Sequence, residues 1–113
     1  MDQVKVEPKY ARIWRGRTMR EKADEYQRYW LETGAEPLIR RGAISVQMLR
    51  EDRETETEFI TISYWATIEA MTGGTGADPR RAHHLDRDEE LLLELPDEVQ
   101  ILNILVARDG AAA

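Results

Sequence analysis

The feature that most constrains the fold is the order in which strand-like and helix-like segments follow one another. Segments rich in branched and aromatic residues predict four strands, and amphipathic or acidic segments between them predict helices. In chain order the expected elements are a strand at 9–15, a helix beginning at 18, strands at 43–50 and 58–65, short helices at 67–72 and 86–94, and a strand at 99–107. This order is the split β-α-β pattern of ferredoxin-like α+β domains, which have an antiparallel sheet. We therefore expect one domain over 1–113, with its core at about 9–107 and a flexible tail at 108–113.

The first predicted helix carries the clearest boundary signals. Thr18 to Glu21 has the pattern of a capping box, in which each side chain bonds to the backbone N–H of the other residue. An apolar stripe at helical spacing follows, and we interpret it as core: Met19, Ala23, Tyr26 and Trp30. Gly34 is expected to end the helix in a left-handed conformation, and Pro37 is expected to prevent it from resuming.

Alternation along the strands divides their side chains between the two faces of the sheet. The more uniformly apolar set is expected to lie under the helices: Ala11, Ile13, Ile44, Val46, Met48, Ile60, Ile62, Tyr64, Leu102, Ile104 and Val106. The other set mixes aromatic with hydrogen-bonding side chains and is expected to form an open face: Tyr10, Arg12, Trp14, Ser45, Gln47, Leu49, Phe59, Thr61, Ser63, Trp65, Val99, Ile101, Asn103 and Leu105.

This open face is too apolar to remain in water, because large contiguous apolar patches usually mark interaction sites. The simplest cover is a second copy of the sheet, since most soluble oligomers are two-fold homodimers. The polar members of the face are costly in a dry interface unless they contact partners, water or a ligand. Two interpretations stay open: these groups satisfy one another through buried water, or they line a small-molecule pocket enclosed in the dimer.

Composition narrows the possible partners and chemistry. With 22 acidic and 16 basic residues the chain has a formal net charge of -6, which repels phosphate backbones and anionic lipids. We therefore expect neither nucleic acid nor membrane as a partner. The longest apolar run is only Ile104 to Ala107, and the N-terminus lacks a secretory pattern, so a cytoplasmic protein is expected. The absence of cysteine excludes disulfides, thiolate metal sites and thiol nucleophiles.

Several segments, in this order, resemble the antibiotic biosynthesis monooxygenase family. They are 10–16, 21–24, 58–60, 63–65 and 68–70, followed by the final strand, so the resemblance covers nearly the whole chain. Ser63-x-Trp65 followed by Ile68-Glu69-Ala70 is the most telling piece and is similar to the family's strand-to-helix junction. The resemblance implies a dimeric α+β barrel. The family includes cofactor-free oxygenases of aromatic polyketides, haem-degrading enzymes, small-molecule isomerases and members with no established activity, so the fold alone does not select a function.

The resemblance to the cofactor-free oxygenases implies a site without metal or other cofactor. In those enzymes the substrate's own carbanion reduces oxygen, and the protein positions the substrate and stabilises negative charge. Arg12 would hold an enolate and Asn103 would donate to developing oxyanion charge. The implied catalytic residues are Trp65, Arg12, Asn103 and His83, and the expected substrate-binding residues are Trp14, Gln47, Phe59, Ser63 and His84. The expected substrate is a small aromatic or enolisable molecule in the barrel pocket.

The sequence departs from the family at 80–85, where related chains often have tyrosines in place of His83 and His84. Either histidine could act as a base near neutral pH. Alternatively, one lines the pocket in place of an aromatic residue and the other faces solvent. Neighbouring histidines point apart, so they do not form a chelating pair, and Asp86 and Asp88 are weak candidate ligands. No metal site is expected.

Two other functions compete with the oxygenase. The haem-degrading members resemble this chain at Trp65, but they place a haem-ligating histidine shortly afterwards, where this sequence has Thr75 in a glycine-rich loop. Haem degradation is therefore disfavoured. The second alternative is a non-catalytic binding or structural dimer whose pocket is filled by side chains and water.

Overall fold

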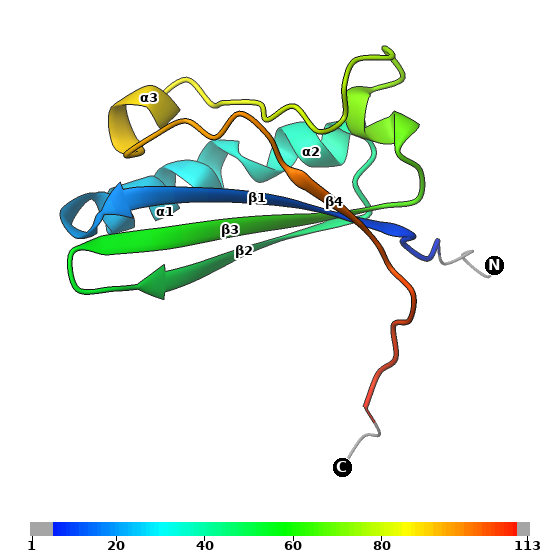
Figure 1. Ribbon diagram of the computed structural model, residues 1–113, viewed down its shortest axis with the longest axis horizontal. Coiled ribbons are helices and arrows are strands. Elements are labelled where there is room, and N and C mark those ends of the chain that lie inside the picture. Colours follow the sequence, from blue (N-terminus) through cyan, green and yellow to red (C-terminus); the bar gives the residue numbers. More distant parts are fainter. Residues whose placement is uncertain (1–5, 111–113) are drawn as a thin grey trace.

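The computed structural model describes residues 6–110 and contains a four-stranded sheet with helices on one face (Figure 1). The elements in chain order are β1 (Tyr10–Met19), η1 (Arg20–Lys22), α1 (Ala23–Thr33), α2 (Ala35–Arg41), β2 (Ser45–Asp52), β3 (Glu56–Trp65), η2 (Glu69–Thr72), α3 (Asp88–Leu91) and β4 (Gln100–Asn103). The strand order is β2-β3-β1-β4, and every pair of neighbours is antiparallel. This confirms the ferredoxin-like α+β fold expected from the element order.

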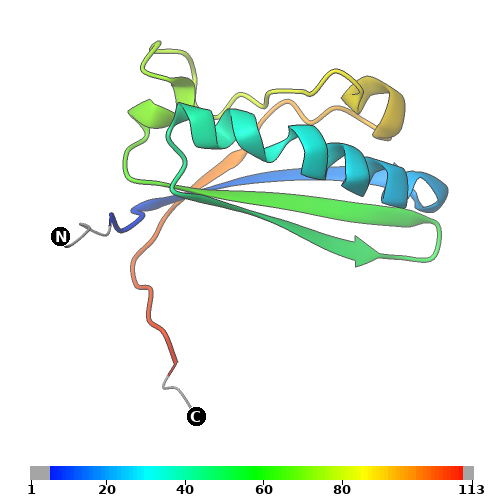
Figure 2. The same ribbon diagram turned by 180° about the vertical axis from the view of Figure 1, so that it is seen from behind.

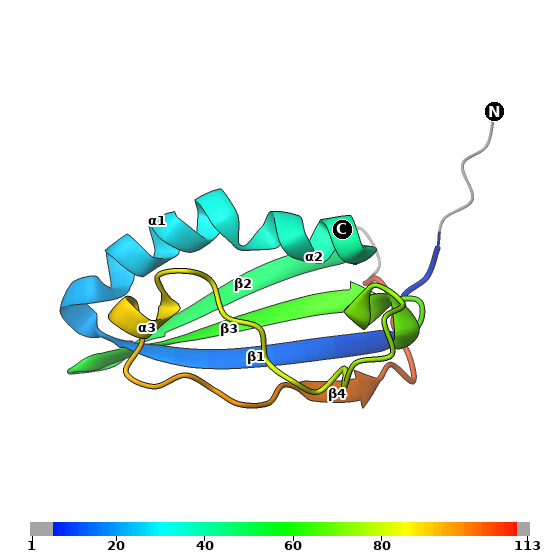
Figure 3. The same cartoon turned by 90° about the horizontal axis from the view of Figure 1, so that it is seen from above.

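One face of the sheet is covered and the other is open. Helices α1 and α2 lie over β2 and β3, while the connection that contains α3 runs back over the side of β1 and β4 (Figure 3). Seen from behind, the same layer stays above the sheet and the chain after β4 leaves on the other side (Figure 2). Within residues 6–110, no helix is both long and apolar enough to cross a membrane.

The expected start of α1 is wrong, while its expected end is right in position but not in conformation. Strand β1 continues past Gly16 to Met19, so the Thr18 side chain is fully buried in the sheet and caps no helix. Helix α1 does end before Gly34, but this residue has a φ of -86°, which is right-handed, and α2 begins directly after it. Pro37 is the third residue of α2, where the missing N–H is tolerated because first-turn amides have no intrahelical partner.

The expected assignment of the two sheet faces is inverted on β1, β3 and β4. The buried positions of β1 and β3 alternate with partly exposed ones, and they are Arg12, Trp14, Gly16 and Thr18 on β1, and Thr57, Phe59, Thr61, Ser63 and Trp65 on β3. On β4, Ile101 packs into the core and Leu102 is exposed. On β2, Val46 and Met48 pack towards the helices as expected.

Aromatic packing explains the inversion. Tyr26 on α1 stacks on Trp14, with ring centroids 6.4 Å apart, and tilts against Phe59 at 5.1 Å. Trp65 lies in a second cluster with Leu38 and neighbouring residues at the α2 end of the sheet. Each buried aromatic side chain removes about 150–250 Å² from water, so burial of Trp14, Phe59 and Trp65 favours this orientation of the sheet.

The open face carries the residues that were expected under the helices. Ile13, Ile60, Ile62 and Tyr64 are partly exposed there and Leu102 is 42% exposed, while Leu49, which was expected on this face, is 44% exposed. The expectation of an apolar open face therefore stands, but with different residues on it.

Candidate functional site

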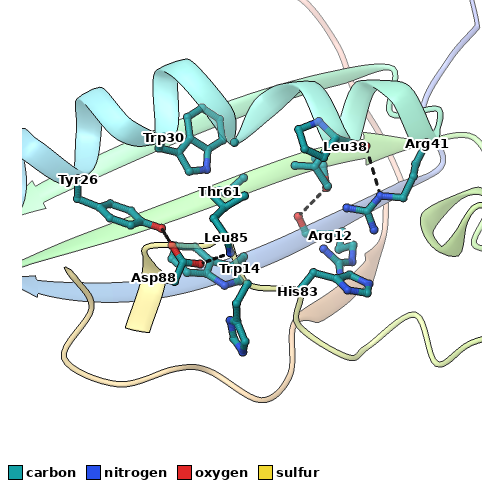
Figure 4. Close-up of a pocket in the computed structure, with 14 residues that line it drawn as sticks. Arg12, Trp14, Tyr26, Trp30, Leu38, Arg41, Thr61, His83, Leu85 and Asp88 are labelled. Carbon is teal, nitrogen blue, oxygen red and sulfur yellow. Dashed lines mark hydrogen bonds between the residues drawn. The ribbon is translucent and has the colours of Figure 1, made fainter. Parts of the chain in front are cut away.

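A cavity of about 210 Å³ lies between the helix layer and the covered face of the sheet (Figure 4). Its floor contains Thr61 and Ser63, two small residues that alternate along β3 between the larger Phe59 and Trp65. Its roof is the junction of α1 and α2 at Gly34, where there is no side chain. The Trp30 ring lies against Gly34, where a Cβ would be 2.6 Å from it, and the small floor residues Thr61 and Ser63 leave space between the two layers.

Arg12 projects from β1 into one end of the cavity and is only 6% exposed. Its Nε and Nη2 donate to the backbone carbonyls of Pro79 at 3.3 Å and Arg81 at 3.0 Å. Burial, together with the nearby positive charge of Arg41, lowers the pKa of Arg12 to about 10, so the group remains a cation at neutral pH.

Arg41, at the end of α2, brings a second guanidinium to the same end. Its Nε and Nη1 donate to the carbonyls of Pro37 at 3.3 Å and Met71 at 3.2 Å, and partial burial lowers its pKa. Among residues 6–110, neither Arg12 nor Arg41 forms an ion pair with a carboxylate. This end of the cavity therefore has an excess of positive charge in a chain whose net charge is negative.

His83 lies at the same end, close to Arg12 in Figure 4, and His84 also lines the cavity. The side chain of His83 is exposed overall, but its partial desolvation lowers its pKa below the ordinary 6.5, and the positive charges of Arg41 and Arg12 lower it further. The imidazole of His83 is therefore neutral at pH 7 and can accept a proton.

The opposite end of the cavity is closed by Tyr26 and Asp88. The Tyr26 hydroxyl donates to Asp88 Oδ1 at 3.2 Å, and the backbone N–H of Leu85 donates to Oδ2 at 2.8 Å. Burial raises the pKa of both side chains. These bonds attach the connection before α3 to α1 and fix one wall of the cavity.

The structure brings together five of the residues that the sequence analysis selected. Arg12, Trp14, Ser63, His83 and His84 all line the cavity, although it lies between the sheet and the helices and not inside a barrel formed with a second copy.

Four other selected residues lie outside the cavity lining. Trp65 is fully buried, and its Nε1 donates to Ser63 Oγ at 2.8 Å, so it reaches the cavity only through Ser63. Phe59 is fully buried against Tyr26. Gln47 is on the open face, where it accepts a hydrogen bond from the Tyr64 hydroxyl at 2.8 Å, and Asn103 is exposed at the end of β4.

Sequence reasoning missed several lining residues. Tyr26 and Trp30 were interpreted as core alone, yet both also contact the cavity. Thr61 was assigned to the open face. Arg41 was not selected, because it lies between the expected helix end at Gly34 and the strand expected at 43–50. Within the described part of the chain, no three His, Cys, Asp or Glu side chains are placed to hold a metal ion together.

Comparison with known proteins bears on the fold. No protein-family model matches the sequence, and no curated protein matches it. Among solved structures, the chain is similar to the crystal structure of a "putative antibiotic biosynthesis monooxygenase" from Bacillus cereus, with a TM-score of 0.62 and 8% sequence identity. The match covers 92% of this chain and 100% of the other. At this identity the likeness concerns structure alone, and it shows that the chain has an antibiotic biosynthesis monooxygenase-like, ferredoxin-like α+β fold.

Proposed function

We propose that the cavity binds a small aromatic or enolisable molecule as its anion, and that the protein is a cofactor-independent monooxygenase. The observation that carries this proposal is the pair of guanidinium groups, Arg12 and Arg41, which face the cavity with no carboxylate partner among the described residues. A buried charge without a partner is costly, and an anionic ligand would supply the missing counter-charge.

The size and walls of the cavity define the rest of the ligand. A volume of about 210 Å³ is below the roughly 300–1,000 Å³ of sites for drug-sized ligands, so one ring or two fused rings fit best. Trp14, Tyr26 and Trp30 provide aromatic walls along the remainder of the cavity. This combination suits a flat molecule with an anionic oxygen at one edge.

His83 supports a proton-transfer step. A neutral imidazole beside Arg12 and Arg41 can remove a proton from an acidic C–H, and the two cations then stabilise the enolate. In the proposed reaction the carbanion reduces dioxygen, and a methylene of the substrate becomes a carbonyl. One oxygen atom of the dioxygen enters the product as that carbonyl oxygen, and the other leaves as water together with the two methylene hydrogens. The substrate supplies all the electrons, so atoms and electrons balance without a further reductant.

A second candidate is a small-molecule-binding dimer without catalysis. It is favoured by the positions of Trp65 and Asn103, two of the four residues expected to act in catalysis, which lie outside the cavity lining. Both candidates share the anion site and differ only in whether oxygen is consumed.

We also propose that the protein is a homodimer formed through the open sheet face, whose central residues are Ile13, Ile60 and Ile62. Ile62→Glu should give a folded monomer in sedimentation experiments, because this side chain is partly exposed in the single chain. Phe59→Glu should instead unfold the protein, because Phe59 is fully buried under α1. A wild-type protein that sediments as a monomer at micromolar concentration contradicts this proposal.

The experiment that tests the function uses three indane probes. Indane-1,3-dione binds as a preformed enolate, 1-indanone is its neutral analogue, and indan-2-one must lose a proton before it can react. Calorimetry should show tighter binding of the enolate than of 1-indanone. An oxygen electrode should show uptake with indan-2-one above the rate without protein, with indane-1,2-dione as the product.

His83→Gln separates proton removal from binding. The variant should lose uptake with indan-2-one but keep its affinity for the enolate of indane-1,3-dione. In the wild type, uptake should fall as the pH drops through the pKa of His83, which lies below 6.5. Binding without oxygen uptake would support the non-catalytic candidate, and failure of the enolate to bind would contradict both.

A further inference from the structure

Two hydrogen-bonding atoms in the cavity walls have no partner among the described residues. They are the indole Nε1 of Trp14 and the hydroxyl Oγ1 of Thr61, and both atoms are buried. The side chains are 8% and 5% exposed and both line the cavity. Buried polar side-chain atoms are rarely left unpaired in folded proteins, so this pair calls for a specific explanation.

The indole of Trp14 is held in place and cannot easily turn its N–H towards another acceptor. Its ring lies so close to the backbone at Gly16 that a Cβ there would be 2.3 Å from the ring atom Cη2. On another side it stacks on Tyr26, with centroids 6.4 Å apart and planes at 16°. The position of Nε1 is therefore set by the packing of the core around it.

Trp14 and Thr61 lie at a different point along the sheet from Arg12 and Ser63. They lie directly opposite each other on β1 and β3, and Arg12 and Ser63 form the corresponding pair two residues along the strands on the same face. Two residues of a strand span about 7 Å, so the cavity has two polar regions at distinct points along its floor. One region offers charged donors and the other offers neutral donors.

We propose that Trp14 Nε1 and Thr61 Oγ1 form a second subsite, which binds a neutral carbonyl oxygen of the same ligand whose anionic group contacts Arg12 and Arg41. An indole N–H can only donate, so its partner must be an acceptor, and a carbonyl oxygen has two lone pairs for two donors. The anionic half of this inference rests on the proposed function. The ligand class is therefore a small aromatic molecule with both an anionic oxygen and a separate ketone.

The test compares 4-acetylbenzoate with 4-isopropenylbenzoate, which has the same shape but a methylene group in place of the ketone oxygen. Wild-type protein should bind the ketone about three- to tenfold more tightly in calorimetric titrations. Thr61→Val keeps the shape of the side chain and removes the hydroxyl, so it should reduce this preference without changing the affinity for 4-isopropenylbenzoate. Trp14→Phe removes the N–H and also shrinks an aromatic wall of the cavity, so it should weaken the binding of both acids and reduce the ratio between their affinities.

Thr57→Val is the matched control, because Thr57 is a buried threonine on the same strand and face but does not line the cavity. Its hydroxyl donates to Asp52 Oδ1 at 2.8 Å. Thr57→Val should therefore lower the melting temperature and leave the ketone preference unchanged. Thr61→Val should keep the melting temperature, because its hydroxyl has no partner to lose.

The outcomes separate this inference from the proposed function. If wild-type protein binds both acids equally, or if Thr61→Val retains the full preference for the ketone, the second subsite is wrong while the anion site stands. If wild-type protein binds neither acid, both proposals are overturned. Loss of the preference in Thr61→Val and Trp14→Phe, but not in Thr57→Val, supports the second subsite.

Discussion

Arg12→Met tests the anion site by removing one of its two cations while keeping a side chain of similar length. Arg12 is 6% exposed and forms no ion pair among residues 6–110, so its charge is available to a ligand. A hydrogen bond between charged groups contributes about 1.5–3 kcal/mol. The dissociation constant for the enolate of indane-1,3-dione should therefore rise about ten- to 150-fold in the variant. Binding of neutral 1-indanone should change by no more than about threefold, because only the charge-assisted contact is lost.

Two further variants control this measurement. Arg15→Met alters an arginine on the same strand whose side chain is 53% exposed and points to the other face, and it should leave both affinities unchanged. Arg12→Lys keeps the positive charge but loses the planar guanidinium group. Its affinity for the enolate should therefore lie between those of wild type and Arg12→Met. Because Arg12 also bonds to the carbonyls of Pro79 and Arg81, circular dichroism must first show that each variant is folded. An equal loss of affinity for the enolate and for neutral 1-indanone would refute the proposed role of Arg12.

Three other substitutions test how the cavity is built. Gly16→Ala should lower the free energy of unfolding by about 1–3 kcal/mol in urea, because its Cβ displaces the Trp14 ring, and an unchanged midpoint would contradict this packing. Ser63→Ala removes the acceptor of Trp65 Nε1 and should destabilise the fold by about 1–3 kcal/mol; a neutral effect would mean that this bond is not formed. Burial raises the pKa of Asp88 above 3.8, so the folded protein holds this proton more tightly than the unfolded chain does. The resulting stabilisation is lost as the pH rises through the pKa of the folded state. Asp88→Asn should therefore gain stability relative to wild type as the pH rises above about 3.8, and a constant difference would count against a buried carboxylate.

The fold class follows from the sequence because the order of strands and helices leaves few topologies. The charged connector at 51–56 separates two strand-like segments, and β2 and β3 do form a hairpin there. The α1 start was harder to place, since Thr18 to Glu21 matches a capping box although Thr18 belongs to β1. Local capping signals were overridden here by pairing with β3, in which Thr18 lies opposite Thr57.

The two faces of the sheet could not be assigned from alternation because β3 is apolar on both sides. Phe59 and Trp65 alternate with Ile60 and Ile62, so either set could form a core. On β2 the alternative to Val46 is polar, and there the assignment was correct. Only the packing of whole aromatic rings against α1 distinguishes the two choices.

Several residues that line the cavity were selected from the sequence, but the cavity was expected on the wrong side of the sheet. Arg12, His83 and Trp14 do line one cavity, but it lies under α1 and α2. Thr61 was expected on the open face because it has the same strand parity as Phe59, which was placed there too. In the fold, its small polar side chain is part of what makes the cavity.

The most direct test of the proposed anion site is a crystal structure of the protein with indane-1,3-dione bound. The proposed site predicts the molecule between α1, α2 and the sheet, with an enolate oxygen within hydrogen-bond distance of the guanidinium of Arg12 or Arg41. A molecule bound instead on the open face of the sheet, beside Ile13 and Ile62, would contradict it.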